Sequence, residues 1–94
     1  MKHSITLDFI ADEISKGNNG NDIVIWDDKT TADHGYNLIT TIINACGPGG
    51  GWPEIKFIGD KEEIIRFLKE VYCTSYDEID EEMLQEFVSS IEKY

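Results

Sequence analysis

Basic residues are scarce in this 94-residue sequence, which has eight Lys and Arg against 19 Asp and Glu and a formal net charge of −11 at pH 7. A surface with such an excess of carboxylates repels nucleic acid and anionic lipid, which argues against direct binding to DNA, RNA or a membrane. The same surface attracts basic proteins and speeds their association. The simpler alternative is that the charge serves only solubility. If the protein has a partner, we expect a basic protein.

Cysteine and long apolar runs are also scarce. The two cysteines, Cys46 and Cys73, form no Cys-x-x-Cys pair and belong to no cluster with histidine, so neither a zinc site nor a redox motif is indicated. No apolar run approaches the ~20 residues that cross a membrane, and the N-terminus lacks the pattern of a signal peptide. We therefore expect free thiols in a cytoplasmic protein that needs no metal or cofactor.

Apolar periodicity predicts four helices, at about residues 7–15, at 32–46, after Asp60, and from about 77–81 to the C-terminal end. Asp60 and Glu63 have the spacing of a capping box. Two β-branched runs, Asp22–Trp26 and Glu54–Ile58, predict short strands, although the first could equally be one helical turn. A strand–helix–strand order favours a parallel pair. We therefore predict an α+β fold, a small single domain of residues 1–94 with helices packed on a minimal two-stranded sheet.

The motifs that often carry chemistry do not fit their usual contexts. The glycine run of residues 47–51 leaves a predicted helix and enters a strand, whereas a phosphate loop leads from a strand into a helix. Asp27, Asp28, Asp33 and His34 do not have the spacing of a calcium loop. No nucleophile pairs with a histidine on the evidence of sequence. The sequence therefore predicts no enzyme and no metal site.

Trp26 is the most suggestive single residue, because it ends an apolar run and is followed by two aspartates. Aromatic residues dominate the energetics of protein interfaces, so Trp26 could anchor a partner; a core tryptophan fits equally well. The predicted last helix has an acidic outer face, with no basic residue between Glu70 and Glu92, and this face either binds a basic partner or is simply solvated. The candidate partner-binding residues are Asp12, Asn21, Asp22, Ile25, Trp26, Asp27, Asp28, Asp80, Glu81, Glu82 and Glu86.

The segment from Gly20 to Trp26 resembles the signature segment of the colicin and pyocin DNase immunity proteins. Asp22 matches the aspartate of that family, and Trp26 stands where the second of two tyrosines would be. Ile25 replaces the first tyrosine, and Asp27 replaces a proline. The resemblance implies that this segment forms a short helical turn that grips the nuclease domain of a toxin.

Residues 55–93 resemble the first two helices of the same family, so the match requires a permuted order. The resemblance implies an alternative fold, an all-α four-helix bundle. It also implies a function: an acidic inhibitor that binds and neutralises a basic nuclease toxin, without catalytic residues of its own. A second hypothesis is a phage-encoded DNA mimic that inhibits a host defence nuclease through its carboxylates.

Overall fold

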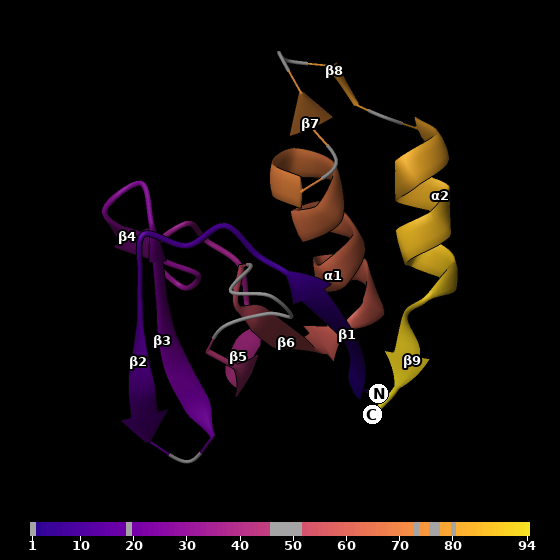
Figure 1. The fold of residues 1–94 in the computed structure, drawn as a ribbon. Coiled ribbons are helices and arrows are strands. Elements are labelled where there is room, and N and C mark those ends of the chain that lie inside the picture. The colour runs from indigo at the N-terminus through magenta and orange to yellow at the C-terminus, as the bar shows by residue number, and fades with distance from the viewer. Residues whose placement is uncertain (1, 19, 46–51, 73, 76–77, 80) are drawn as a thin grey trace.

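Strands dominate the fold. The computed structural model describes residues 2–18, 20–45, 52–72, 74–75, 78–79 and 81–94 (Figure 1). The elements are β1 (Lys2–Asp8), β2 (Glu13–Asn18), β3 (Asn21–Trp26), β4 (Lys29–Thr30), β5 (Ile39–Asn44), β6 (Glu54–Asp60), α1 (Lys61–Phe67), the π-helical turn η2 (Leu68–Tyr72), β7 (Thr74–Ser75), β8 (Glu78–Ile79), α2 (Glu81–Ser89) and β9 (Glu92–Lys93).

The predicted fold class is wrong. Among the described residues, one antiparallel sheet has the order β5-β6-β1-β9, a second has the order β2-β3-β4, and β7 and β8 form a small ribbon. Neither a minimal two-stranded sheet nor an all-α four-helix bundle is present. The two strands that we predicted, β3 and β6, belong to different sheets and do not form a parallel pair. In Figure 1, α1 and α2 lie side by side above the four-stranded sheet.

The predicted helix at residues 7–15 is wrong because the two-residue alternation of the N-terminal segment decides its structure. Ile5, Leu7 and Phe9 are at most 4% exposed, whereas Ile10 is 64% exposed. Successive side chains of a strand point to opposite faces, and this pattern matches β1 and the residues that follow it. The chain then crosses to the second sheet and continues as β2.

The predicted helix at residues 32–46 is also wrong. Its second half forms β5, in which Thr40 faces Phe57 and Ile42 faces Ile55 of β6. The β-branched run at 40–43 favours a strand, because branched side chains pack well on a pleated surface. The first half forms a turn, where Gly35 has a φ of 92° that other residues adopt at a cost.

Both strand predictions and both C-terminal helix predictions are confirmed, by β3, β6, α1 and α2, except that α2 ends at Ser89 and Glu92–Lys93 form β9. The start of α1 is nevertheless not a capping box. The side chain of Asp60 makes no capping hydrogen bond. The carboxylate of Glu63 instead accepts the Asn37 N–H at 3.0 Å and pairs with Arg66 at 2.9 Å.

An aromatic cluster fills the space between the helices and the sheets. Phe67 of α1 is fully buried, and its ring centroid lies 4.6 Å from that of Phe57, 5.6 Å from that of Phe9 and 5.3 Å from that of Tyr36. Tyr36 donates its hydroxyl to the Glu70 carboxylate at 2.9 Å. Burial first, and then this carboxylate, raise the pKa of Tyr36 to about 12. The cluster therefore ties α1 to both sheets and to the turn before β5.

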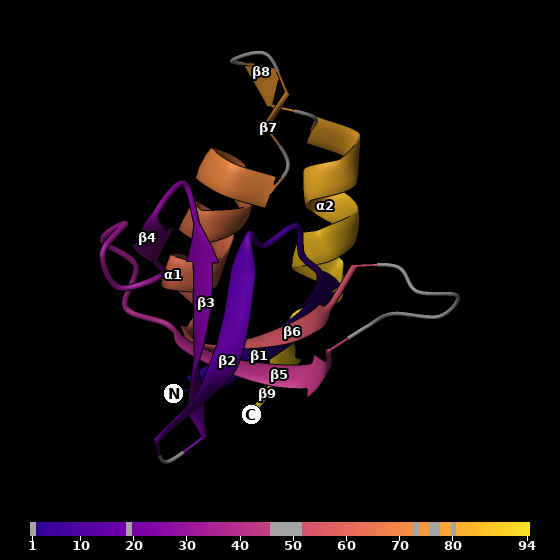
Figure 2. The same cartoon turned by 60° about the vertical axis from the view of Figure 1, so that its left-hand side comes forward.

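A buried carboxylate joins the two sheets. Asp22 of β3 is 6% exposed and accepts the Gly17 N–H of β2 at 3.1 Å and the Ile42 N–H of β5 at 2.8 Å. The hydroxyl of Thr40 donates to the Asp22 carbonyl, and that of Thr41 donates to the Gly20 carbonyl at 2.7 Å. Figure 2 shows β3 crossing in front of β5 and β6. Hydrogen bonds from side chains therefore hold the hairpin of β2 and β3 across the larger sheet.

Asp22→Ala should destabilise the protein by about 3 kcal/mol, because it leaves the Gly17 and Ile42 N–H groups without their acceptor and removes two hydrogen bonds to a charged group. The matched control is Glu13→Ala, which removes an exposed carboxylate from the neighbouring strand and should change stability by less than about 0.5 kcal/mol. Urea unfolding of both variants and the wild type measures the difference. Equal losses in the two variants would show that Asp22 does not join the sheets.

The same carboxylate should make stability depend on pH. The Ile42 N–H first, and the Gly17 N–H second, lower the pKa of Asp22 in the folded state. A carboxyl group with a lowered folded pKa stabilises the fold above its unfolded pKa of about 3.9 and loses that contribution as the pH falls through the folded pKa. The wild type should therefore lose more stability than Asp22→Asn between about pH 5 and about pH 2, as measured by urea unfolding. Parallel curves for the two proteins would contradict this assignment.

Candidate functional site

The structure places the two central residues of the predicted partner site in the interior. Asp22 has both carboxylate oxygens engaged by the chain itself, as described above. Trp26 is 8% exposed, and its ring stacks on that of His34 at 4.2 Å with an interplanar angle of 10°. His34 Nε2 also lies 3.0 Å from the Trp26 carbonyl oxygen. Trp26 is thus a core tryptophan, the alternative that the sequence left open.

The other predicted residues near the hairpin play two different parts. Asn21 accepts the Thr40 N–H through its side-chain oxygen at 3.3 Å, so it also belongs to the contact between the sheets. Ile25 is partly buried. Asp27 and Asp28 are exposed and form the two-residue turn between β3 and β4.

Asp27 and Asp28 adopt φ angles of 53° and 63°, the left-handed region that Asp tolerates better than most residues. Two such residues are what a tight turn between twisted strands requires. Asp12 lies beside them, because its carboxylate accepts the Asp27 N–H at 3.2 Å. We call these three residues, Asp12, Asp27 and Asp28, the acidic turn. The structure thus brings Asp12 together with two predicted residues that lie 15 and 16 positions later in the sequence.

The predicted acidic face of the last helix exists on α2. Glu81, Glu82 and Glu86 are exposed, whereas Leu84 on the opposite side is 2% exposed and packs in the core. Asp80, the fourth acidic residue that we assigned to this face, lies outside the described residues. The acids of α2 and the acidic turn lie on different elements, and no described hydrogen bond or ion pair joins them.

An apolar hollow of about 510 Å³ opens where the chain crosses from β1 to β2. It is lined by Asp8, Phe9, Ile10, Trp26, Trp52, Val71, Tyr72 and Met83, and we call it the apolar groove. Trp52 is 55% exposed and Ile10 is 64% exposed, so both side chains present large apolar surfaces to solvent. Phe9 and Trp26 form the buried floor, where their rings meet edge to face at 5.0 Å.

A second hollow of about 380 Å³ shares Trp52 with the apolar groove. Its other described lining residues are Ala11, Asp12, Glu13, Ile14, Ala45 and Pro53. Through Asp12 the acidic turn reaches this hollow, and through Met83 the apolar groove reaches α2, beside Glu82 and Glu86. The described residues that line the two hollows include three carboxylates and no basic side chain. Exposed apolar surface bordered by charge of one sign is typical of protein-binding surfaces.

The sequence drew attention to Trp26, as an anchor or as a core residue, but the exposed tryptophan is Trp52. Trp52 lies between a glycine run and Pro53, outside every strand and helix, and this position is the signal that could have drawn attention to it. A large aromatic side chain outside a regular element has no fixed face to bury. Trp26 lies on the buried side of an alternating strand, where a core position is expected.

The described residues hold no group of three or more His, Cys, Asp or Glu side chains that could bind a metal ion. Asp33 accepts the Thr30 hydroxyl at 2.9 Å and the Thr30 N–H at 3.2 Å; these bonds lower its pKa and close a turn. The glycine run at 47–51, Cys46 and Cys73 lie outside the described residues. Within the described ranges, no helix is both long and apolar enough to cross a membrane.

Comparison with known proteins finds no matching family model, no matching curated protein and no matching solved structure. Any statement about function therefore depends on the surface that the fold itself presents.

The two tryptophans should differ in solvent access. Acrylamide, which is neutral and is not repelled by the negative surface, should quench the wild type much more strongly than Trp52→Phe. The emission of Trp52→Phe should also lie at shorter wavelength, because only the buried Trp26 remains. Steady-state fluorescence of the two proteins tests this. Equal quenching would mean that Trp52 is covered and that the apolar groove is closed.

Proposed function

We propose that this chain is an acidic inhibitor protein that binds a basic nuclease toxin and neutralises it. The observation that supports the proposal is the apolar groove, in which exposed Trp52 and Ile10 lie with Asp8, next to a hollow that is lined by Asp12 and Glu13. Apolar side chains at the centre and charge at the margin match the anatomy of protein–protein interfaces.

The groove supplies the part of the binding energy that salt does not screen. Exposed Trp52 can transfer much of its surface from water into a partner, and buried aromatic residues at the centre of an interface often contribute ~2 kcal/mol or more. The rings of Phe9 and Trp26 hold the floor in place, because both are fixed in the core. Binding then costs these side chains little conformational entropy, which favours affinity.

The carboxylates supply orientation and speed of association. The chain carries a net charge of −11. Asp12 of the acidic turn lines the hollow that adjoins the groove, and α2, which lines the groove through Met83, exposes Glu82 and Glu86. A nuclease has a basic cleft for its phosphate substrate, and a protein of opposite charge is drawn to that cleft. Once bound, such a protein blocks the substrate by bulk and by charge. Inhibition of this kind requires no catalytic group of its own.

A second candidate function is the mimicry of DNA, in which carboxylates stand in for phosphates. The exposed Glu81, Glu82 and Glu86 on a single helix favour it, because they present several negative charges along one rigid element. In that case the apolar groove would contribute little to affinity. The first candidate function therefore predicts that Trp52 dominates binding, and the second predicts that the glutamates of α2 do.

The test is a pull-down from cells that contain the natural partner, with tagged protein at low and high salt, followed by purification of any basic protein retained at high salt. Nuclease activity of that protein is then measured with and without this chain. Trp52→Ala should weaken binding by ~2 kcal/mol or more, about thirtyfold in Kd. Tyr94→Ala is the matched control, because Tyr94 is 67% exposed and lies outside both hollows.

Three outcomes separate the alternatives. If Trp52→Ala weakens binding to the partner and Tyr94→Ala does not, the interface is centred on the groove. If binding weakens step by step as Glu81, Glu82 and Glu86 are changed to Gln, and Trp52→Ala binds as well as the wild type, the DNA mimic is favoured. Retention of many basic proteins at low salt alone, none of them inhibited, would contradict both functions.

A further inference from the structure

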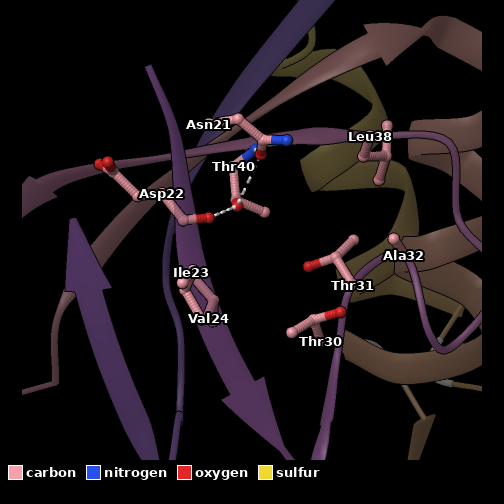
Figure 3. Close-up of a pocket in the computed structure, with 9 residues that line it drawn as sticks. All are labelled: Asn21, Asp22, Ile23, Val24, Thr30, Thr31, Ala32, Leu38 and Thr40. Carbon is pink, nitrogen blue, oxygen red and sulfur yellow. Dashed lines mark hydrogen bonds between the residues drawn. The ribbon is translucent and has the colours of Figure 1, made fainter. Parts of the chain in front are cut away.

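A small cavity of about 140 Å³ lies between β3, the turn after β4 and the start of β5. Its described lining residues are Asn21, Asp22, Ile23, Val24, Thr30, Thr31, Ala32, Leu38 and Thr40 (Figure 3). The interior is formed by side chains at most 7% exposed, such as Val24, Thr31 and Leu38. The mouth is formed by the exposed residues Asn21, Ile23 and Ala32. The cavity is therefore partly enclosed and partly open to solvent.

One polar atom in this cavity has no hydrogen-bond partner among the described residues, the hydroxyl oxygen of Thr31. Thr31 is only 4% exposed, and Figure 3 shows its oxygen pointing into the space towards Val24. A buried hydroxyl without a partner lowers the stability of the fold, because its hydrogen bonds to water are not replaced. Such a group in a cavity is well placed to bond a molecule that enters.

Two other polar groups at the cavity already form hydrogen bonds within the chain. The Thr40 hydroxyl donates to the Asp22 carbonyl. The Asp22 carboxylate points away from the cavity in Figure 3 and accepts N–H groups of Gly17 and Ile42. The accessible chemistry is thus one free hydroxyl among aliphatic side chains, with the Asn21 amide at the mouth.

We propose that this cavity is a binding site for a small neutral molecule with an aliphatic body and one hydroxyl or amide group. The aliphatic body packs on Val24 and Leu38, and the polar group forms a hydrogen bond with the Thr31 hydroxyl. A cavity of about 150 Å³ holds benzene, so a ligand here has about six non-hydrogen atoms. The site is separate from the apolar groove, because the two share no lining residue.

The test follows backbone amide shifts by NMR while isobutyramide, isobutanol or benzene is added. Isobutyramide and isobutanol should produce saturable shifts at residues 22–24, 30–32 and 38–40. Thr31→Val has nearly the same shape but no hydroxyl, and it should bind isobutyramide about three- to tenfold more weakly, the effect of one neutral hydrogen bond. Benzene, which cannot form that bond, should bind Thr31→Val at least as well as the wild type.

Two further variants serve as controls: one blocks the mouth of the cavity, and the other repeats the Thr-to-Val change away from it. Ala32→Leu places a larger side chain at the exposed mouth and should abolish binding of all three probes. Thr6→Val makes the same chemical change at an exposed position on β1, away from the cavity, and should leave binding unchanged. Thr31→Val should also melt at a higher temperature than the wild type, since it removes a buried hydroxyl without a partner.

The proposal is overturned if neither polar probe gives a saturable shift with the wild type, which would mean that the cavity holds water only. Equal affinity of Thr31→Val and the wild type for isobutyramide would also overturn it. So would a lower melting temperature of Thr31→Val, because the hydroxyl would then be satisfied by the chain itself.

Discussion

The hydrogen bonds of the Asp22 carboxylate are the constraint on which the rest of the structure depends. Asp22 lies on β3 of one sheet and accepts the Ile42 N–H of the other, while it also accepts the Gly17 N–H of its own hairpin. Gly17 has no room for a side chain, because an added Cβ would lie 2.0 Å from the Asn21 carbonyl oxygen. With the hairpin held across the larger sheet in this way, Trp26 enters the aromatic cluster. Bonds to charged acceptors are stronger than neutral ones, so this carboxylate adds to the neutral hydrogen bonds that Thr40 and Thr41 form between the sheets.

The aromatic core determines which apolar side chains remain at the surface. Phe67 contacts the rings of both Trp26 and Phe9, so the segment that crosses from β1 to β2 is held against α1. The next side chain along that segment, Ile10, must then point outwards, and it lines the same groove as the exposed Trp52. The exposed apolar surface is thus a consequence of how the core is filled. Its position beside the acidic turn and α2 supports a function in binding a basic protein.

Two features that lower stability lie within five residues of each other. Asp27 and Asp28 adopt left-handed backbone angles, and Thr31 buries a hydroxyl without a described partner. Each could be relieved by a simple substitution, such as glycine in the turn or valine at 31. Strain and unsatisfied polar groups occur preferentially at functional sites, where the surrounding structure compensates for them. Thr31 lines the cavity, and Asp12, which accepts the Asp27 N–H, lines the hollow that adjoins the groove.

The sequence by itself determined the elements with strong local signals: the strands at 22–26 and 54–58, the helix after Asp60 and the helix that begins at Glu81. It also determined the net charge of −11. Only the tertiary structure decided that residues 2–8 and 39–44 are strands, because their apolar residues fit a helical stripe as well as an alternating one until a neighbouring strand pairs with them. It likewise decided that Asp22 and Trp26 are buried and Trp52 is exposed. Burial depends on contacts between residues far apart in the chain, and local patterns carry no record of those contacts.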